Sequence, residues 1–367
     1  MKDIKIGKRV ISETGDCFMI AEIGHNHQGD LQKALEMIEV AAQCGADAVK
    51  FQKRDNKALY TSEQYNAPYE NENSFGSTYG EHREFLEFGW DEYVQLKKCA
   101  EENNVEFMCT PFDFQSVEFL EKLGVSSYKL ASADITNTPL INYVASFKKP
   151  VFISTGACTM EEIAMAYETV LKHTDKLVLF HCVSAYPPEY ENLNLRIIMT
   201  LKREFPKAII GYSGHDNGIL APVIAAMLGA RVFEKHFTIN HSWKGTDHKF
   251  SLEPTGLRKQ IRNLRRIGLS LGTGTKVLNE YELAARIKMG KSLYSSRALE
   301  RGQILSCEDI VIKSPGKGVP PYKLDDFLGK KLLCDMPAET LLSYEHIESH
   351  KECYTADEIE RLTISTA

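Results

Sequence analysis

The sequence lacks the features that mark membrane, secreted and nucleic-acid-binding proteins. No stretch approaches the roughly 18 consecutive apolar residues of a membrane-spanning helix, and the polar first residues, MKDIKIGKRVISETGD, hold no apolar segment typical of a signal peptide. The 44 Lys and Arg residues nearly balance the 50 Asp and Glu residues, and no long run has one sign. We therefore expect a cytoplasmic protein that binds a small molecule, with no nucleic-acid or membrane partner.

Paired cysteines are also missing. The nine cysteines are an odd number and form no C-x-x-C pair or regular spacing, which argues against a disulfide framework and against a zinc knuckle. Reduced thiols in the cytoplasm are the simpler interpretation. Hydrophobic residues make up 43% of the 367 positions, enough for a sizeable core, so we expect one large domain and a smaller one.

Short apolar, β-branched runs alternate with amphipathic helical stretches through most of the chain. In "GDLQKALEMIEVAAQCGA", for example, Asp30 can cap a helix in which Leu31, Ala34 and Ile38 share one face. Eight such units within about 250 residues match an α/β fold of the (β/α)8 TIM-barrel type, whereas a doubly wound sheet usually stops at about five or six strands. The expected strands cover residues 18–24, 48–52, 105–112, 127–132, 151–156, 176–183, 208–215 and 231–237.

Two intervals depart from this rhythm. Residues 56–89 are aromatic, polar and too long for an ordinary connection, so we expect them to handle substrate at the barrel mouth. After residue 290 the segments become short and separated by turns, which predicts a small β-rich domain. We predict a catalytic barrel with an N-terminal β extension over residues 1–271, a linker over 272–290, the small domain over 291–350 and a polar tail over 351–367.

Polar residues gather where each expected strand ends, which is where TIM barrels place their active sites. One ionic group at such a position would mean little, but a whole ring of them indicates a site for a charged ligand. The ring comprises Glu22, Lys50, Gln52, Thr110, Lys129, Ser132, Ser154, Ser184, Tyr186, Ser213, His215, Glu234 and His236.

The run "GARVFEKHFT" places three polar residues in an otherwise buried strand. Because side chains alternate along a strand, Glu234 and His236 share the barrel lumen while Lys235 faces the helices, where we expect it to pair with a helix carboxylate. A lone core histidine is more often structural, but His215 and His236 end adjacent strands. Two imidazoles leave positions open for water and substrate, as in a catalytic metal site.

Lys50 and Lys129 are costly to bury unless they face an anion. With the neighbouring hydroxyls they would form a cradle for a phosphate and a carboxylate; ordinary salt bridges to Glu22, Asp134 or Glu234 would satisfy them equally well.

Two weaker signals are interpreted structurally. The pair His25 and His27 in "IGHNHQGD" lies in a loop, where a capping and hydrogen-bonding turn is commoner than a metal site. The segment "GTGTK" at 272–276 follows no strand in the manner of a phosphate-binding loop and is assigned to the linker.

The ordered motifs of the chain resemble the sialic acid synthase (N-acetylneuraminate synthase) family. The resemblance rests on "AEIGHNHQGD", "GADAVKFQK", "TYGEHREFLEF", "CTPFD", "YKLAS", "HCVSAYPP", "IGYSGHDNG", "EKHFT" and "KGTDHKFSLEP", followed by "GKSLYSSRALERGQILSCEDIVIKSPGKG", which resembles the family's antifreeze-like (SAF) domain. It covers residues 16–348.

This resemblance implies a transferase that condenses phosphoenolpyruvate with the open-chain aldehyde of an N-acetylhexosamine, usually N-acetylmannosamine. The product would be a nonulosonic 2-keto acid, and phosphate would leave by C–O cleavage. The family requires a divalent metal, Mn²⁺ or Mg²⁺, and works as a homodimer with the SAF domain over the partner's barrel.

The resemblance also implies roles for individual residues. The metal ligands would be His215 and His236; the phosphoenolpyruvate-binding residues would be Lys50, Thr110, Lys129, Ser132, Ser154, Ser184 and Ser213; the sugar-binding residues would be Gln52, Tyr186 and Asp247; and the catalytic carboxylates would be Glu22, Asp134 and Glu234. Which carboxylate acts as acid or base stays open at this point.

Several positions depart from the family pattern. Many bacterial members have Glu at Asp134, and some have Asn at Ser184. Some members carry "KRPG", whose arginine reaches the partner's sugar, where this chain has "KSPGKG"; Ser314 cannot replace that guanidinium, so Lys313 or Lys317 would take over, or the sugar differs.

The sugar and the reaction class therefore have alternatives. "TYGEHREFLEF" and "SWKGTDHKFSLEP" resemble the animal-type enzymes, which use a 6-phosphorylated sugar, and Arg83 and Lys244 are candidates for binding that phosphate. The rival functions are a Schiff-base aldolase with Lys129 or Lys50 as its nucleophile and a non-catalytic sugar-binding barrel.

Overall fold

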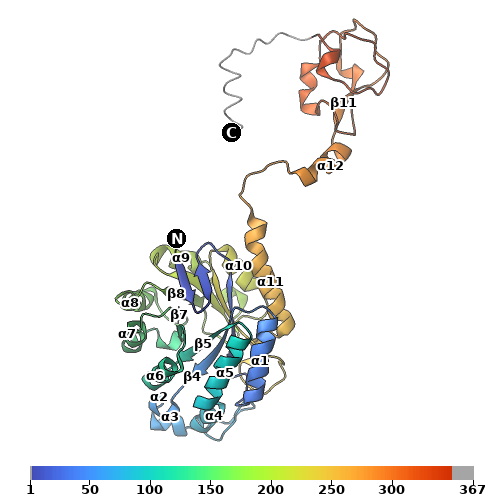
Figure 1. Cartoon of the computed structure of the whole chain (residues 1–367). Helices are drawn as coiled ribbons and strands as arrows, with labels where there is room; N and C mark the ends of the chain where they lie inside the picture. The colour runs from blue at the N-terminus through green and yellow to red at the C-terminus, as the bar shows by residue number, and fades with distance from the viewer. Residues whose placement is uncertain (1, 349–367) are drawn as a thin grey trace. The chain divides into compact units, whose positions relative to one another are not determined.

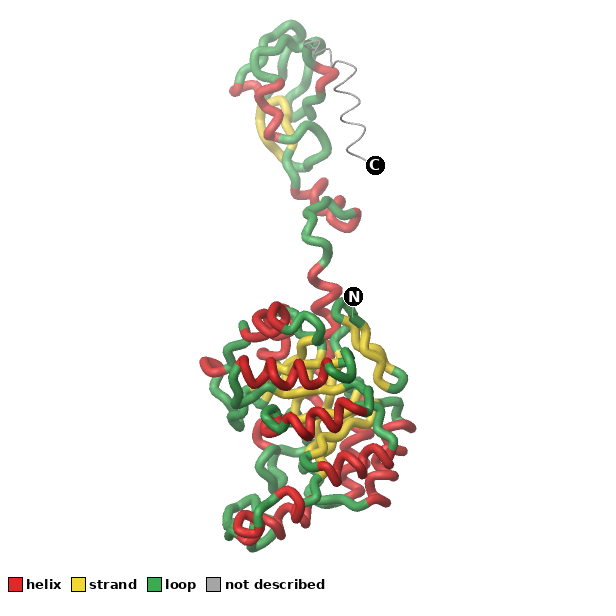
Figure 2. Tube along the Cα trace, turned by 90° about the vertical axis from the view of Figure 1, so that its left-hand side faces the viewer, coloured by secondary structure: helices red, strands yellow, loops and turns green. Residues whose placement is uncertain are grey.

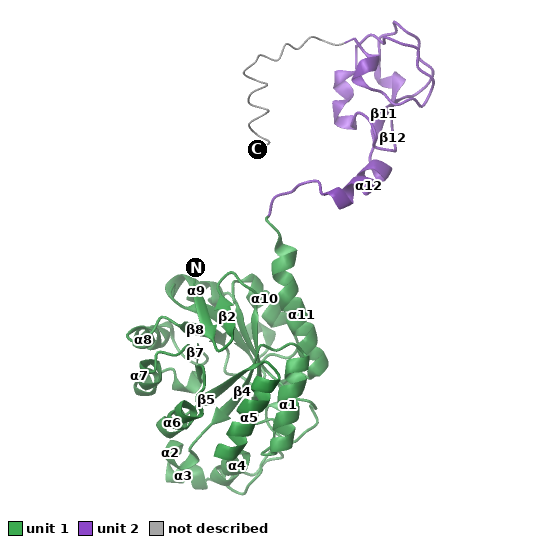
Figure 3. Ribbon diagram, in the orientation of Figure 1, with its two compact units in different colours: residues 1–273 green, residues 274–367 purple. Residues whose placement is uncertain are grey.

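A computed structural model describes residues 2–348 of the chain. The chain divides into two compact units, residues 1–273 and 274–367 (Figure 3). The polar tail predicted over 351–367 lies outside the described residues.

The first unit is built around eight parallel strands. Their hydrogen-bonded order is β5-β4-β3-β10-β9-β8-β7-β6, and contact between β5 and β6 nearly closes the sheet into a barrel. The predicted TIM-barrel fold is therefore confirmed, and every strand lies within or next to its predicted range. The strands are β3 (Phe18–Gly24), β4 (Ala48–Lys53), β5 (Glu106–Pro111), β6 (Tyr128–Leu130), β7 (Val151–Ser154), β8 (Leu177–Cys182), β9 (Ile209–Gly214) and β10 (Val232–His236).

Helices surround these strands (Figures 1 and 2). Asp30 caps α1 as expected, because its side chain accepts hydrogen bonds from two backbone amides, and an interaction of this kind contributes about 1 kcal/mol. Helices α1, α5 and α11 lie side by side against the barrel (Figure 1). The covering helices are α1 (Leu31–Gln43), α5 (Trp90–Glu102), α6 (Phe114–Leu123), α7 (Thr138–Ser146), α8 (Met160–Leu171), α9 (Ile197–Glu204), α10 (Leu220–Met227) and α11 (Pro254–Leu271).

The barrel interior changes from apolar to polar along each strand. On β3, Phe18 and Ile20 join an interior cluster, and the next inward position is Glu22; on β10, Val232 joins the cluster and is followed by Glu234. Strand alternation therefore puts an apolar layer at the amino ends and a polar layer at the carboxyl ends. The interior cluster comprises Ile4, Ile6, Ile11, Phe18, Ile20, Ala48, Met108, Phe152, Val178, Phe180, Ile209 and Val232.

An N-terminal hairpin closes the amino end of the barrel. It consists of β1 (Asp3–Ile6) and β2 (Arg9–Ser12), paired in antiparallel register. Its three isoleucines are almost completely buried in the interior cluster, and burying each contributes about 1.5–3 kcal/mol. The hairpin thus forms a floor beneath the polar layer.

The long interval after β4 is ordered. It contains α2 (Asn56–Leu59), α3 (Ser62–Asn66) and α4 (Tyr79–Leu86), and Thr78 and Glu81 form a capping box at the start of α4. Aromatic contacts of Tyr69 and Phe75 with His82 hold the interval against α4. It therefore presents α4 side chains at a defined position.

The second unit has its own small core. Strands β11 (Ser292–Ser295) and β12 (Ile310–Lys313) pair in antiparallel register over buried side chains such as Leu293, Phe327 and Leu342. Helix α12 (Glu280–Met289) lies within the span predicted as a linker. Short 3-10 turns in the two units are η1 (Ser132–Asp134), η2 (Tyr190–Asn192), η3 (His248–Phe250), η4 (Cys307–Asp309), η5 (Pro321–Asp326) and η6 (Tyr344–His346). Within residues 2–348, no helix has the length and apolar character needed to cross a membrane.

Candidate active site

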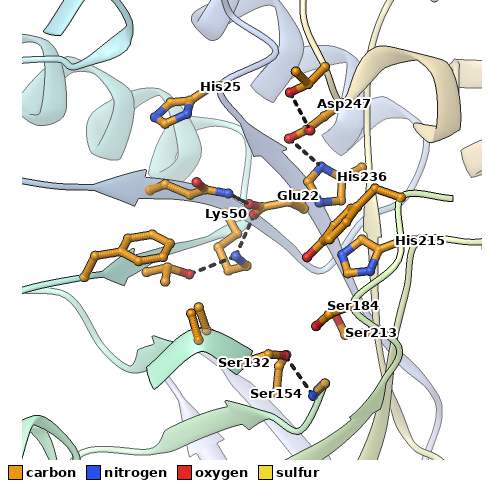
Figure 4. A pocket seen from close by; sticks show the side chains of 18 of the residues that line it. Glu22, His25, Lys50, Ser132, Ser154, Ser184, Ser213, His215, His236 and Asp247 are labelled. Carbon is orange, nitrogen blue, oxygen red and sulfur yellow. Dashed lines mark hydrogen bonds and ion pairs between the residues drawn. The ribbon is translucent and has the colours of Figure 1, made fainter. Parts of the chain in front are cut away.

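A pocket of about 880 Å³ opens at the carboxyl ends of the barrel strands. Every barrel residue predicted for the site lines this pocket except Asp134 and Lys244. Figure 4 shows side chains from several strands converging on it. The strand-end residues identified from the sequence therefore line a single cavity.

Strand register brings the polar residues together. Glu22 on β3 lies opposite Lys50 on one side and His236 on the other, while Gln52 pairs with Thr110 and Glu234 with Ser213. Since neighbouring strands lie about 4.8 Å apart, side chains at paired positions are within hydrogen-bonding reach.

Two lysines and two carboxylates form a buried charged row. Lys50 Nζ lies 2.7 Å from Glu22 Oε2 and 3.6 Å from Glu234 Oε1, and it donates to Thr110 Oγ1 at 2.9 Å. Lys129 Nζ lies 3.5 Å from Glu234 Oε1. The salt bridges considered from the sequence thus form with Glu22 and Glu234, in a cavity large enough to admit an anion as well.

Lys129 marks the deep end of the pocket. Its ammonium donates to Ser154 Oγ at 2.6 Å and lies 5.2 Å from the ring centroid of Phe180, a member of the interior cluster. Burial lowers the pKa of Lys129, which an arriving anion would counteract.

The two carboxylates have opposite pKa shifts. Burial raises the pKa of Glu22 against the opposing influence of Lys50. Burial also acts to raise the pKa of Glu234, but Lys129 and then Lys50 outweigh it and lower that pKa to about 2. Carboxyl groups whose pKa values are pushed apart in this way can take different acid and base roles.

Serine hydroxyl groups lie close to the α-carbon of Gly156, beside the buried row of lysines and carboxylates. Gly156 N donates to Ser132 Oγ at 2.9 Å, and a Cβ added at Gly156 would lie 2.2 Å from Ser184 Oγ. Figure 4 places Ser132, Ser154 and Ser184 on the same side of the pocket. Hydroxyls and a backbone amide in this arrangement are suited to hold phosphate or carboxylate oxygens.

The two imidazoles have the character of metal ligands. His215 Nδ1 lies 3.1 Å from the Val183 carbonyl, which orients the ring and leaves Nε2 available. His236 Nδ1 is buried without a hydrogen-bond partner, 3.7 Å from Asp247 Oδ2, and the two ring centroids are 5.4 Å apart. Burial lowers the pKa of both imidazoles, that of His215 to about 4, so both are neutral as metal binding requires.

This donor set fits a divalent cation with open coordination positions. Across residues 2–348, no group of three or more His, Cys, Asp or Glu side chains is already arranged to hold a metal by itself. The two imidazoles would therefore need water or substrate oxygens to complete the coordination of an ion.

Asp134 does not lie where the sequence suggested. It belongs to the 3-10 turn η1, in which successive side chains point about 120° apart, so Ser132 faces the pocket and Asp134 turns away. Its Oδ1 accepts from Asn137 Nδ2 at 3.2 Å, and burial raises its pKa to about 6. A direct role at the reacting carbons does not follow from this position.

Lys235 pairs with a loop carboxylate rather than with a helix carboxylate. Its ammonium lies 3.0 Å from Asp216 Oδ1 and also donates to the Asp216 carbonyl, in the loop that follows β9. Tyr212 OH donates to the same carboxylate at 2.7 Å. The pair ties β10 to the segment that carries His215.

The sequence interpretation missed part of the pocket wall. His25, assigned to a structural turn, lines the pocket, and so does Arg54, which the ring of strand-end residues omitted. The two-residue spacing of Lys50, Gln52 and Arg54 is a signal that could have found the arginine.

The long interval also reaches the cavity. It contributes Asn73, Phe75, His82 and Arg83 to the pocket wall. Lys244, the other candidate for binding a sugar phosphate, does not line the pocket.

Comparison with known proteins finds matches over both units. Residues 37–276 match the model of the NeuB family, and residues 290–348 match that of the SAF domain. N-acetylneuraminate-9-phosphate synthase from Homo sapiens is 39% identical over 91% of this chain and 93% of its own length. N,N'-diacetyllegionaminic acid synthase from Legionella pneumophila is also 39% identical, over 91% of this chain and 95% of its own length.

A solved structure is similar as well. The N-acetylneuraminic acid synthetase of Leptospira borgpetersenii serovar Hardjo-bovis, in complex with citrate, aligns with a TM-score of 0.67 and 35% identity, covering 77% of this chain and 95% of that one.

Proposed function

The chain belongs to the NeuB family, and we propose that it is a phosphoenolpyruvate-dependent nonulosonate synthase that uses N-acetylmannosamine or a related N-acetylhexosamine. The observation that carries this proposal is that one pocket contains both a lysine and serine cradle for anions and a pair of neutral imidazoles. Phosphoenolpyruvate brings two anionic groups, and the sugar brings an aldehyde that needs polarisation.

The cradle would bind and orient phosphoenolpyruvate. Lys50, Lys129 and the hydroxyls of Thr110, Ser132, Ser154, Ser184 and Ser213 would neutralise and hold its phosphate and carboxylate. Gln52, Tyr186 and Asp247 would position the sugar so that its aldehyde carbon faces C3 of phosphoenolpyruvate.

In the proposed reaction, C3 of phosphoenolpyruvate forms a bond to the aldehyde carbon, whose oxygen takes up a proton. Water then adds at C2 and passes one proton to a carboxylate. The C2–O bond to phosphate then breaks while the new C2 hydroxyl gives its proton to the departing phosphate, which leaves the 2-keto acid. In this proposal Glu22, which accepts a hydrogen bond from Gln52 Nε2 at 2.7 Å, would take up the proton of the attacking water. His215 and His236 would hold Mn²⁺ or Mg²⁺, which when bound supplies Lewis-acid polarisation of the aldehyde.

We also propose a homodimer in which the SAF domain of one copy covers the barrel mouth of its partner. The match of residues 290–348 to the SAF domain supports this idea. Light scattering of the purified chain would return the mass of one subunit if the proposal is wrong.

The eight free cysteines among the described residues are in keeping with a cytoplasmic location.

A substrate panel tests the reaction. Consumption of phosphoenolpyruvate with Mn²⁺ is measured with N-acetylmannosamine, its 6-phosphate, mannose 6-phosphate and a diacetamido-trideoxyhexose. We expect turnover with at least one sugar and a 2-keto acid product by mass spectrometry. No consumption with any of them would overturn the proposal.

Isotope labelling and trapping test the chemistry. Phosphoenolpyruvate labelled with ¹⁸O in its bridging oxygen should pass the label to phosphate if the C–O bond breaks, and label in the keto acid would contradict C–O cleavage. A Schiff-base aldolase would be trapped by borohydride as a covalent adduct on Lys129 or Lys50, whereas the proposed enzyme gives no adduct.

A further inference from the structure

Each imidazole of the proposed metal site is next in sequence to one member of a buried ion pair. Asp216 follows His215, and Lys235 precedes His236. The Lys235 ammonium lies 3.0 Å from Asp216 Oδ1 and also donates to the Asp216 carbonyl. The two side chains are 0% and 1% exposed. One salt bridge therefore links the two positions that carry the imidazoles.

This ion pair lies outside the pocket. Neither Lys235 nor Asp216 lines the cavity, whereas His215 and His236 both do. Along β10 the side chains alternate, so Lys235 shares the outer face of the strand with Phe233. A substrate in the pocket does not contact the pair, and any influence of the pair on the imidazoles has to pass through the backbone.

The backbone ladder between β9 and β10 stops just before His215. The last paired residues of this ladder are Lys235 and Gly214, and β9 itself ends at Gly214. The chain leaves the sheet at the residue that carries the first imidazole. The Lys235–Asp216 contact joins it to β10 again on the other side, so His215 lies between two attachment points.

The Asp216 carboxylate is itself held in place. Tyr212 OH donates to Asp216 Oδ1 at 2.7 Å, and Tyr190 OH donates to the carbonyl of the next residue, Asn217, at 2.8 Å. A Cβ added at Gly214 would lie 2.5 Å from Asp216 Oδ1 and 2.5 Å from Tyr212 Cε1. The glycine therefore leaves the space that the carboxylate and the tyrosine ring occupy.

Packing alone does not account for charged residues at this place. Replacing a buried ion pair by well-packed apolar residues is often neutral or stabilising, whereas an ion pair fixes the separation of two particular groups. Phe233 and Phe237, on the same face of the strand as Lys235, belong to the hydrophobic core around the barrel. An apolar residue would match these neighbours, so a lysine here points to a requirement for geometry.

We infer that Lys235 and Asp216 are positioning residues, which hold His215 and His236 at the separation and orientation that one divalent cation needs. The two ring centroids are 5.4 Å apart, and metal–nitrogen distances vary by only about 0.2 Å between sites. A small shift of the chain after β9 would therefore weaken the binding of the ion. This inference rests on the proposed function, which assigns the metal to the two imidazoles.

Binding of Mn²⁺ to the full chain tests the inference without turnover. The electron paramagnetic resonance signal of free Mn²⁺ is followed during a titration, in the absence of phosphoenolpyruvate and sugar. Lys235→Met should weaken Mn²⁺ binding by about 10- to 100-fold, as the loss of groups that orient metal ligands does in other sites. Asp216→Asn should have a smaller effect in the same direction, since the amide can still accept from Tyr212.

The double variant and a matched control sharpen this measurement. Lys235→Met with Asp216→Asn should bind Mn²⁺ no more weakly than Lys235→Met alone, because both changes remove the same link. Lys149→Met is the control: it removes a lysine that lies 2.6 Å from Glu121, in a part of the barrel that carries neither imidazole. The control should bind Mn²⁺ as the wild type does. Tryptophan fluorescence of the same samples establishes that the barrel is folded.

Steady-state kinetics separate positioning of the imidazoles from a general loss of structure. In Lys235→Met, the Mn²⁺ concentration for half-maximal activity should rise by the same factor as the dissociation constant. The KM for phosphoenolpyruvate at saturating Mn²⁺ should stay unchanged. A general loss of structure would instead lower activity at every Mn²⁺ concentration and leave the half-maximal concentration as it is, which would overturn the inference.

The failures of the two proposals are distinguishable. Wild-type affinity for Mn²⁺ in folded Lys235→Met and Asp216→Asn would overturn the positioning role and leave the proposed function intact. If the wild type binds no Mn²⁺, or if His215→Ala binds it as tightly as the wild type, the metal assignment and this inference fail together.

Discussion

Replacing Lys235 by methionine tests how the last two barrel strands are held together. The Lys235 ammonium is essentially inaccessible to solvent and is paired with Asp216, which Tyr212 also contacts. Methionine preserves most of the side-chain volume but leaves the Asp216 carboxylate without its cation. Removing one partner of a buried pair costs about 3–5 kcal/mol because an uncompensated charge remains. For a unit of this size, that corresponds to a fall of about 6–20 °C in Tm.

Asp216→Asn should be milder than Lys235→Met. Burial already lowers the pKa of Lys235, so the ammonium left without a carboxylate can lose its proton and still donate to the carbonyl. The double variant removes both charges and should therefore be more stable than Lys235→Met alone. A coupling energy of about 2–3 kcal/mol is expected from the cycle.

Tryptophan fluorescence during urea unfolding measures this cycle in the full chain. The two tryptophans of the sequence, Trp90 and Trp243, both lie in the first unit, so the signal reports the barrel. Lys202→Met is the matched control, since the Lys202–Glu13 pair is partly exposed and should contribute less than about 1 kcal/mol. Strictly additive effects of Lys235→Met and Asp216→Asn would refute the reasoning.

Three further predictions concern the metal, the cradle and acid stability. Chelation by EDTA should abolish phosphoenolpyruvate consumption by the wild type, and Mn²⁺ should restore it; full activity of His215→Ala or His236→Ala would remove the metal assignment. Gly156→Ala should raise the KM for phosphoenolpyruvate at least about tenfold, since its Cβ would overlap the Ser184 hydroxyl; an unchanged KM argues against the cradle. Burial lowers the pKa of His248 to about 4, so between about pH 6.5 and 4 the unfolded state binds one more proton and stability falls as pH falls. In urea titrations at several pH values, His248→Gln should reduce the dependence of the free energy of unfolding on pH by at most about 1.4 kcal/mol per pH unit. A pH dependence equal to that of the wild type would contradict this prediction.

The barrel could be predicted from the sequence because its signals are local. Each strand is a short apolar run flanked by residues that end it, and each helix has its own cap and apolar face. Alternation within a strand then decides which side chains enter the lumen, as Val232, Glu234 and His236 illustrate. The set of strand-end residues could therefore be predicted from the sequence.

The remaining features depend on non-local geometry. Asp134 faces away from the pocket because the 3-10 turn η1 points its side chain in a different direction from that of Ser132. A carboxylate that follows a strand in the sequence does not by itself reveal such a turn. The partner of Lys235 is a loop residue whose position depends on the path of the chain after β9. The position of His25 in the pocket wall is another example, because its contacts with Arg54 and Arg83 join residues that are far apart in sequence.

The hairpin floor has a kinetic consequence. Because Ile4, Ile6 and Ile11 close the barrel beneath Lys129, a ligand bound at the deep end has to travel past the residues of the outer pocket. A sugar already bound in the outer pocket would block that route, so phosphoenolpyruvate should be the first substrate to add. Initial-rate patterns should then be those of an ordered mechanism.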